Sequence, residues 1–456
     1  MALSYPVDAP VQPDPVTPSS VAFHLRLGLF GFVLPLLEQL DARIDRRLVK
    51  TFLCTLEALM KFRNRAHGLL LSELGGYLMP PDQAPAGTKR LSNLLHSSKW
   101  SASLICDYLW DQARFRYHEL LEAGQTALML WDESVIEKPE SISSEGLCAV
   151  RSSKAQRLKR IKPGFYTPPL GPPVFVPGLQ WMALLLLGQS GPPTVVAMKW
   201  WTTRGTLAQN KRELQIALLT RCMATFPQVL HVFDRGYAGG PWLELLLNSQ
   251  ATFVVRWPKH YKLVANDPLF TPQNAWRLIC GKRSMGRRLV WDARRQQWRR
   301  DGVLFLPVWT TDLRHRLWLV VSRTGNGREP WYLLTNQPVQ SVDDAWKIIK
   351  AYARRWQIEM AWRYQKSELA VESPRLWTWE CREKLLLMVT LLYAFLISLL
   401  QPQFKTLREW ILRHFCHRTG ERNRQKAAPL YRLRSAISRL WSTSQTNDRA
   451  YSQNSG

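Results

Sequence analysis

The sequence has few features of an exported, disulfide-stabilised or membrane-spanning protein. Its seven cysteines are odd in number and form no C-x-x-C pair, which predicts buried reduced thiols. The first 20 residues are rich in proline and lack the basic start and apolar centre of a secretory signal. The longest apolar run, Leu385 to Leu400, has 16 residues, fewer than the roughly 20 that cross a bilayer. We expect a buried helix there, no membrane partner, and a cytoplasmic protein.

Acidic residues are also scarce. Asp and Glu number 35 against 62 Lys and Arg in 456 residues, which leaves a formal net charge of +27. Nucleic acid and anionic membranes both bind such a surface, because each releases counterions when basic side chains neutralise its phosphates. At roughly 100 to 200 residues per domain, the length predicts two to four domains with a sizeable core. Nucleic acid is the favoured partner, since no segment is predicted to span a membrane.

The N-terminal part of the chain has the spacing of helices. Residues 1–20 alternate proline with small polar groups and predict a flexible, disordered arm. Over residues 21–123 apolar side chains recur at helical intervals, which predicts a helical DNA-binding domain. The segment GTKRLSNLLHSSKWS carries Lys89, Arg90 and Lys99. There are two interpretations, and the sequence does not decide between them. Either these side chains place a helix against DNA, or they form an ordinary solvated helix face.

The rest of the chain predicts an α/β core with an insertion. Residues 124–259 alternate short apolar runs with helical segments, and residues 338–402 return to helical spacing, so together they predict one mixed α/β core. Between them, residues 260–337 are short apolar runs divided by polar turns, which predicts a β-rich insertion domain. Residues 403–456 form a basic tail, and we expect disorder after about Trp441.

Two aspartates directly follow predicted strands. Asp132 comes after the apolar run TALMLW, and Asp234 comes after VLHVF. Carboxylates at strand ends lie on the rim of an α/β sheet, where such folds usually build their sites. Each aspartate alone has a simpler explanation, because Asp commonly caps the turn or helix that follows a strand.

A third pattern lies in the helical segment downstream. Tyr352, Arg355, Glu359 and Lys366 follow the spacing Y-x2-R-x3-E-x6-K, and at 100° per residue they fall within about 60° of one another on a helix. A solvated amphipathic face with an Arg355–Glu359 pair would look the same. The two strand-end aspartates and the basic chain favour a metal site, because Mg²⁺ prefers carboxylate and phosphate oxygens.

Three stretches together resemble the IS4 family of bacterial transposases. They are WDES at 131–134, FDRGYAGGPWLELL at 233–246 and YARRWQIEMAWRYQK at 352–366. The resemblance spans roughly Thr126 to Leu400. It implies an α/β fold with an RNase H-like mixed-sheet catalytic core, a β-rich insertion within that core, and a helical N-terminal domain.

The resemblance also implies the catalytic residues. Asp132, Asp234 and Glu359 would be the catalytic metal ligands, holding two Mg²⁺ ions for which Mn²⁺ can substitute. In a two-metal site, one ion activates the attacking water or 3′ hydroxyl and the other stabilises the leaving oxygen. By the same resemblance Glu133, beside Asp132, supports the site without binding metal.

Four DNA-binding residues follow from the same resemblance, and Arg256 is a fifth candidate by its place after a strand. Tyr352, Arg355 and Lys366 would grip phosphates near the DNA end, and Trp331 in WYLLTNQP would stack with a flipped base. Trp331 could instead pack in the sheet, as most of the neighbouring tryptophans must. Arg256 follows a predicted strand. Its side chain either reaches a DNA phosphate or is simply solvated.

Two weaker features complete the sequence-based interpretation. The basic run RSSKAQRLKRIK at 151–162 follows DNA or is a mobile loop, and the sequence leaves this open. The nine histidines show no metal-ligand spacing, so we expect structural roles for them.

The implied function is cut-and-paste transposition of an insertion sequence. Its steps would be cleavage at the DNA ends, a hairpin step, and strand transfer into target DNA. The partners would be double-stranded DNA, both insertion-sequence ends and target, and a second copy of the chain in a synaptic homodimer associated with the bacterial nucleoid. A metal-dependent nuclease without joining activity and a catalytically decayed DNA-binding regulator are the alternatives, and a membrane-surface protein is a distant fourth.

Overall fold

The fold is known from a computed structural model of the chain. The described residues are 17–138, 143–152, 174–265, 271–292, 297–311, 315–325, 329–416 and 430–453. Most of the predicted arm and most of the basic run at 151–162 lie outside them.

Five helices begin the described chain, where helical spacing predicted them. They are α1 (Pro18–Asp41), α2 (Arg46–Lys61), α3 (Leu71–Leu78), α4 (Ala84–His96) and α5 (Ser103–Glu122), with a short 3₁₀ turn, η1, at Pro81–Gln83. Local signals explain where the first two begin. The Thr17 hydroxyl accepts from the Ser20 N–H, and the Asp45 carboxylate accepts from the Arg47 N–H, so each side chain satisfies a helix N–H that lacks a backbone partner.

Twelve strands within the described residues join into one mixed sheet. They are β1 (Leu128–Glu137), β2 (Cys148–Arg151), β3 (Phe175–Leu187), β4 (Thr194–Trp201), β5 (Leu230–Phe233), β6 (Thr252–Arg256), β7 (Lys262–Ala265), β8 (Gln273–Asn274), β9 (Gly286–Asp292), β10 (Gln297–Trp309), β11 (Leu317–Arg323) and β12 (Trp331–Thr335). The order is β2-β3-β1-β5-β6-β12-β11-β10-β7-β8, with β4 on β3 and β9 on β10. Pairing is parallel for β1–β5 and β5–β6 and antiparallel elsewhere.

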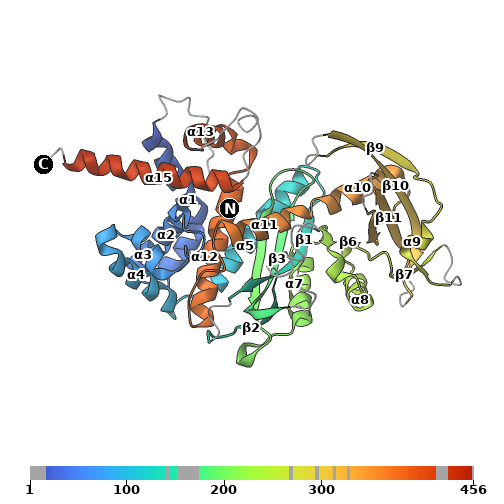
Figure 1. The fold of residues 1–456 in the computed structure, drawn as a ribbon, viewed down its shortest axis with the longest axis horizontal. Coiled ribbons are helices and arrows are strands. Elements are labelled where there is room, and N and C mark those ends of the chain that lie inside the picture. Colours follow the sequence, from blue (N-terminus) through green and yellow to red (C-terminus); the bar gives the residue numbers. More distant parts are fainter. Residues whose placement is uncertain are drawn as a thin grey trace, which may run out of the picture.

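The strands predicted between residues 260 and 337 extend this sheet and do not form a separate one. β12 returns to pair with β6, with Thr335 opposite Val254. The Thr335 hydroxyl also donates to the Phe253 carbonyl at 2.6 Å. Figure 1 shows the resulting elongated molecule, with the N-terminal helices at one end and β9 to β11 at the other.

Helices cover both faces of the sheet. The helices downstream of β4 are α7 (Lys211–Thr225), α8 (Gly240–Asn248), α9 (Ala275–Leu278), α10 (Val342–Ala353), α11 (Trp356–Ser367), α12 (Trp379–Ser398), α13 (Lys405–Phe415) and α15 (Leu430–Gln453), with 3₁₀ turns η2 (Gly205–Leu207), η3 (Arg235–Tyr237) and η4 (Pro402–Phe404). Of these, α13 and α15 pack mainly on other helices. Side chains alternate along β1. Leu128 and Leu130 join the core under α10 to α12, while Met129 and Trp131 join the core under α7 and α8.

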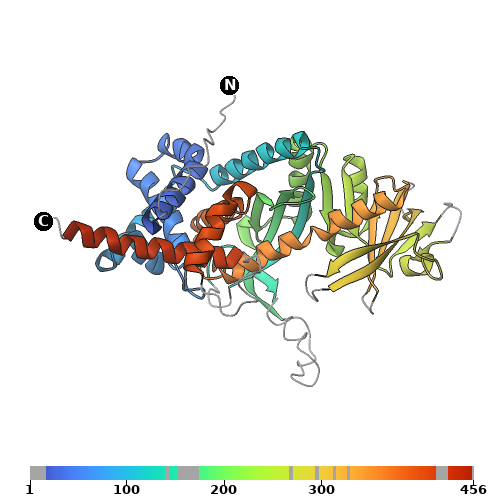
Figure 2. The ribbon, with the colours of Figure 1, turned by 90° about the horizontal axis from the view of Figure 1, so that it is seen from above.

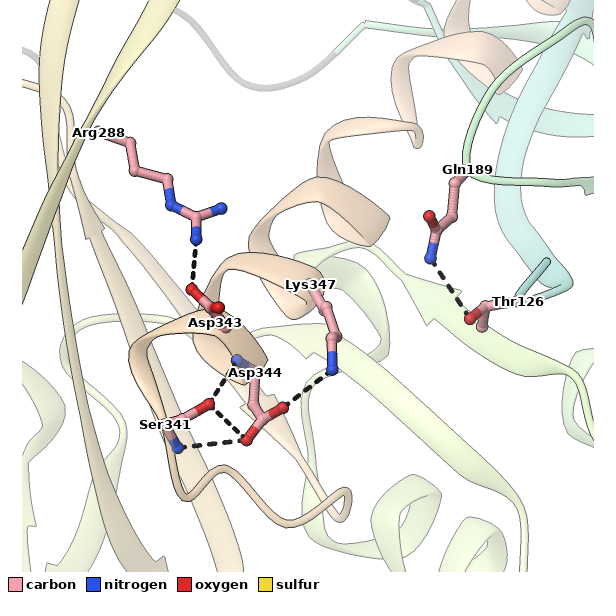
Figure 3. A network of polar contacts seen from close by, with 7 residues as sticks. All are labelled: Thr126, Gln189, Arg288, Ser341, Asp343, Asp344 and Lys347. Atoms are coloured by element: carbon pink, nitrogen blue, oxygen red, sulfur yellow. Dashed lines mark hydrogen bonds and ion pairs between the residues drawn. The ribbon is translucent and has the colours of Figure 1, made fainter. Parts of the chain in front are cut away.

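Helix α10 begins with a strong cap and runs along one face of the sheet. The Ser341 hydroxyl accepts from the Asp344 N–H at 3.1 Å, and the Asp344 carboxylate accepts from the Ser341 N–H at 3.2 Å, which is a capping box. Figure 3 shows this cap together with Arg288, which reaches Asp343 from β9. Figure 2 shows α10 and α11 roughly in line. The cap therefore fixes where the helix pair starts.

Helix α12 is the buried helix that the apolar run predicted. Sixteen of its 20 residues are buried, and it packs against α2, α4, α5 and β4. By length and composition alone, α1 is the one helix among the described residues that could cross a membrane, and α12 with α13 qualifies only as a pair bent by 77°. Eight residues of α1 are nevertheless buried in the core.

Basic side chains fasten the C-terminal helices to the N-terminal ones. Lys384 Nζ on α12 donates to the carbonyls of Leu95 at 3.1 Å and Ser97 at 2.8 Å, at the end of α4. In the same way, Arg434 on α15 donates to the carbonyls at the end of α2. Carbonyls at a helix C-terminus lack backbone partners, so these cations satisfy groups that would otherwise be buried and unpaired.

The C-terminal tail is more ordered than the sequence predicted. We expected disorder after about Trp441, but α15 continues to Gln453. Its buried residues Leu433, Ile437 and Leu440 recur at helical spacing, and α15 packs against α1, α2 and α13. These buried residues fix the first turns of α15. Each further residue then joins the helix at little cost in conformational free energy.

Candidate active site

Strand register brings the two aspartates side by side. Residues Leu128 to Trp131 of β1 pair in parallel with Leu230 to Phe233 of β5, so Asp132 and Asp234 each lie one residue beyond that ladder. Asp234 follows the end of β5 and begins η3, as predicted. The prediction that Asp132 follows a strand end is wrong, because β1 continues to Glu137 through its pairing with β3. Asp132 lies inside β1, at the point where its neighbour β5 ends.

The Y-x2-R-x3-E-x6-K residues are carried by two helices and not by one. Helix α10 ends at Ala353 and α11 begins at Trp356. At the break the Arg355 N–H donates to the Tyr352 carbonyl at 3.0 Å. This hydrogen bond spans three residues, as in a 3₁₀ turn, and not the four of an α-helix. The prediction of one continuous helix is therefore wrong. Their side chains nevertheless gather on one side, because Tyr352 contacts Asp234, Arg355 contacts Asp132 and Glu359, and Lys366 contacts Ser134.

Arg355 lies among the three predicted carboxylates. Its Nη1 is 3.6 Å from Asp132 Oδ2, its Nε is 3.9 Å from Asp234 Oδ1, and its Nη2 pairs with Glu359 Oε1. The Arg355 side chain is 8% exposed. Burial opposes its charge, but the coulombic pull of Tyr352 and the three carboxylates raises the pKa of Arg355 above its usual value. One guanidinium is thus the shared counter-ion of all three acids.

Neutral donors complete the surroundings of the aspartates. The Trp362 indole N–H donates to Asp132 Oδ2 at 3.1 Å, and the Glu133 N–H donates to Asp132 Oδ1 at 2.9 Å. The Tyr352 hydroxyl donates to Asp234 Oδ1 at 3.3 Å. Burial raises the pKa of Asp132 to about 6, against the opposing effects of Arg355 and these donors. Burial likewise raises the pKa of Tyr352 to about 12, so this hydroxyl is a donor at neutral pH.

The other predicted DNA-contacting residues lie around this cluster. Lys366 Nζ donates to the Ser134 hydroxyl at 2.9 Å, two residues along β1 from Asp132. The Trp331 ring, at the start of β12, lies 5.2 Å from the Tyr352 ring. Arg256 ends β6 opposite Leu333 of β12, close enough to influence the pKa of Tyr352.

Glu133 faces away from this cluster, as the alternation of side chains along a strand requires. Its Oε1 accepts from Gln215 Nε2 at 2.7 Å, and its Oε2 lies 2.5 Å from Lys211 Nζ. Both partners belong to α7. Glu133 therefore ties β1 to a helix on the opposite face of the sheet.

The three carboxylates offer the oxygen ligands that Mg²⁺ and Mn²⁺ prefer. They are also reachable, because the side chains of Asp132, Asp234 and Glu359 are 16%, 36% and 33% exposed. Over the described ranges, however, no three Asp, Glu, His or Cys side chains are close enough to hold one ion. Arg355 lies between them. The donor set fits divalent ions chemically, and binding requires the guanidinium to move.

Several partners of these residues were not predicted from the sequence. Trp362 follows Tyr352 by ten residues, about 80° away on a helix, so the wheel that grouped the four motif residues could have included it. Ser134 could have been found by alternation from Asp132. No sequence pattern pairs Lys211 or Gln215 with Glu133, since only the packing of α7 on β1 brings them together.

Comparison with known proteins bears on the central part of this arrangement. Residues 208–395 match the family model of the transposase DDE domain. The matched segment contains Asp234 and Glu359 and begins after Asp132. Among curated proteins, none matches this chain. The similarity of residues 208–395 to the transposase DDE domain supports a transposase of the DDE type, an enzyme that cleaves and transfers DNA.

Proposed function

We propose that this protein is the cut-and-paste transposase of an insertion sequence of the IS4 family, built on an RNase H-like core. The observation that carries the proposal is the convergence of Asp132, Asp234 and Glu359 on one guanidinium, from three separate elements. Three carboxylates meeting at a basic site are suited to divalent ions and to phosphates. The partner would be double-stranded DNA, both at the insertion-sequence ends and at the target.

Asp132, Asp234 and Glu359 would hold the catalytic ions, two Mg²⁺ with Mn²⁺ as a substitute. When bound, these ions supply activation of the attacking oxygen and stabilisation of the leaving oxygen. The chain's own contribution is to position the ligands. Trp362 and the Glu133 N–H each hold one oxygen of Asp132, and Tyr352 holds Asp234.

The basic residues would position the DNA strand. Lys366 donates to the neutral hydroxyl of Ser134, and a charged phosphate is a stronger acceptor for the same ammonium. Arg355, displaced from the carboxylates, would reach the phosphate of the strand being cut. Trp331 lies against Tyr352 and is half-buried, so part of its face is available to a flipped base, while Arg256 would contact the adjoining backbone.

The complete reaction would have three stages. First, water hydrolyses the strand and frees the 3′ end. Second, this 3′ hydroxyl attacks the opposite strand, which forms a hairpin and releases the flanking DNA. Third, water hydrolyses the hairpin, and the restored 3′ hydroxyl attacks a target phosphodiester, which joins the end and frees a target 3′ hydroxyl. Two ends must be processed together, which calls for two copies of the chain in the synaptic complex. A nuclease without joining activity would use the same carboxylates, so only joined products separate the two functions.

The experiment incubates the purified protein and Mg²⁺ with a labelled duplex that carries the DNA ends flanking its own gene. The Asp132→Ala variant is run beside it. Nicks at the end followed by joined products, absent in the variant, are expected. Cutting without joining would assign a nuclease, and binding without cutting would assign a decayed or regulatory copy.

A further inference from the structure

The hairpin of β9 and β10 presents an aromatic and basic face to solvent. Its register places Trp298 opposite Trp291, Arg300 opposite Leu289, and Gly302 opposite Arg287. Directly opposed residues of an antiparallel pair point to the same side. The residues that share this outer face are therefore Arg287, Leu289, Trp291, Trp298 and Arg300.

The inner face of the hairpin is anchored on α10. Arg288 pairs with Asp343 (Figure 3). The Arg288 guanidinium also lies over the Trp346 ring, 5.6 Å from its centre. A Cβ added at Gly286 would lie 2.5 Å from the Val342 side chain, so strand and helix are in close contact there. These contacts fix which face of the hairpin looks outward.

The outer face is unusually apolar for a solvent-facing surface. The exposed fractions of Leu289, Trp291 and Trp298 are 63%, 45% and 64%. The two indole rings lie 5.4 Å apart at an interplanar angle of 64°. Large aromatic side chains are normally buried, and a cluster of them in solvent marks an interaction surface.

Charge decides among the possible partners. Arg287 and Arg300 are exposed on the same face as the indoles, and the chain carries a formal net charge of +27. A second copy would bring the same arginines and the same charge to the contact, so repulsion disfavours it. Nucleic acid offers phosphates to the guanidinium groups and flat bases to the indoles.

We propose that the outer face of the β9–β10 hairpin is a second DNA-binding surface, which stacks accessible bases on Trp291 and Trp298 and holds the adjoining phosphates with Arg287 and Arg300. The proposal rests on the proposed function for the identity of the polyanion. The helix that covers the inner face of the hairpin also carries a residue of the carboxylate cluster, because Gly286 packs against Val342 and Tyr352 lies ten residues further along α10, about 15 Å at 1.5 Å per residue.

The test measures DNA binding without cleavage. Fluorescence anisotropy in EDTA gives Kd for a labelled blunt duplex and for the same duplex with an unpaired tail. Trp298→Ala is compared with Trp377→Ala, which removes an equally exposed indole (66%) elsewhere. We expect Trp298→Ala to raise Kd for the tailed DNA at least fivefold, Trp377→Ala to change it less than twofold, and Trp298→Phe to retain most of the binding.

The arginine contribution has its own matched pair. Arg300→Gln should reduce the slope of log K against log salt by about one, and Arg221→Gln, at an exposed ion pair on α7, should leave the slope unchanged. Circular dichroism melts check that every variant is folded. If the folded Trp298→Ala and Arg300→Gln variants bind like the wild type, or if blunt and tailed DNA are weakened equally by Trp298→Ala, the proposal is overturned. A wild type that binds neither DNA would instead overturn the proposed function as well.

Discussion

Arg355 Nη1 lies 3.6 Å from Asp132 Oδ2, so a helix start and a strand interior far apart in the chain meet at a buried charge pair. The same guanidinium serves Asp234 and Glu359. Three carboxylates this close repel one another, and removing a buried partner leaves an uncompensated charge. Arg355 therefore stabilises the arrangement that divalent ions would use, and it occupies the space between the ligands.

This relationship predicts that removing Arg355 makes the fold depend on metal. Without Mg²⁺, Arg355→Gln should lower the free energy of unfolding by about 3 kcal/mol, because the carboxylates lose their shared cation. Added Mg²⁺ should restore more stability to the variant than to the wild type, since no guanidinium has to leave. Urea denaturation over a Mg²⁺ series measures both effects. Arg363→Gln, at an exposed position of the same helix, is the control.

An equal response to Mg²⁺ in Arg355→Gln and the wild type would contradict this account. It would mean that the guanidinium does not compete with the ions for the three carboxylates.

Glu359→Gln should abolish cleavage and leave DNA binding intact. The substitution keeps the size of the side chain but removes the charge that a divalent ion needs, so the cleavage rate should fall at least a hundredfold. Gel assays of nicking and of binding in EDTA give the two readouts. Glu133→Gln is the matched control, because Glu133 contacts α7 and not Arg355. Unchanged cleavage by Glu359→Gln would remove Glu359 from the site.

Local patterns and the family resemblance together singled out the residues of this cluster, but not the backbone that carries them. The apolar run before Asp132 suggested a strand that ends there, because Asp132 is the first charged residue after the run. The strand in fact continues, since the long partner β3 supplies hydrogen bonds as far as Glu137. Such pairing depends on a segment some 50 residues away, which no local pattern reveals.

The break between α10 and α11 was invisible for a similar reason. Arg354, Arg355 and Trp356 are all acceptable in a helix, so propensity gave no reason to stop. In the structure Arg354 donates to the Gly191 carbonyl, and Arg355 turns toward the carboxylates. These tertiary contacts favour the break.

The exposed face of β9 was also hidden in the sequence. Arg287, Leu289 and Trp291 alternate with Arg288, Val290 and Asp292, so each face of the strand combines basic and apolar residues. Only the packing of Gly286 and Arg288 on α10 shows which face is covered.

Trp331→Ala should slow the hairpin step more than the first nick. Base stacking on an aromatic ring contributes about 1–3 kcal/mol per base, and a flipped base is needed only when the 3′ hydroxyl attacks the opposite strand. We expect hairpin formation to slow roughly tenfold and first nicking less than threefold. Denaturing gels of end-labelled DNA resolve nicked and hairpin products over time, and Trp331→Phe should retain most of the activity.

Equal slowing of both steps by Trp331→Ala would assign Trp331 to packing against Tyr352, 5.2 Å away. That contact would then be its whole contribution.

Metal binding should depend on pH through Asp132. Burial raises the pKa of Asp132 to about 6 in the metal-free protein, and only the ionised carboxylate binds a divalent ion. Mg²⁺ affinity should rise by up to tenfold per pH unit below about pH 6 and level off above it. The stability of the metal-free fold depends on pH with the opposite sign. Because the native pKa is above the unfolded value, this group's contribution to stability is largest in acid and is lost as pH rises through about 6.

Isothermal titration calorimetry in buffers of different ionisation enthalpy measures both the affinity and the protons released. About one proton per protein should be released near pH 5, where the carboxyl is protonated, and none near pH 8. Asp132→Asn should lose this proton release, whereas Glu133→Gln should keep it, because Glu133 is paired with Lys211 on the opposite face. An affinity that stays constant between pH 5 and 7 would show that Asp132 is already ionised when the metal arrives.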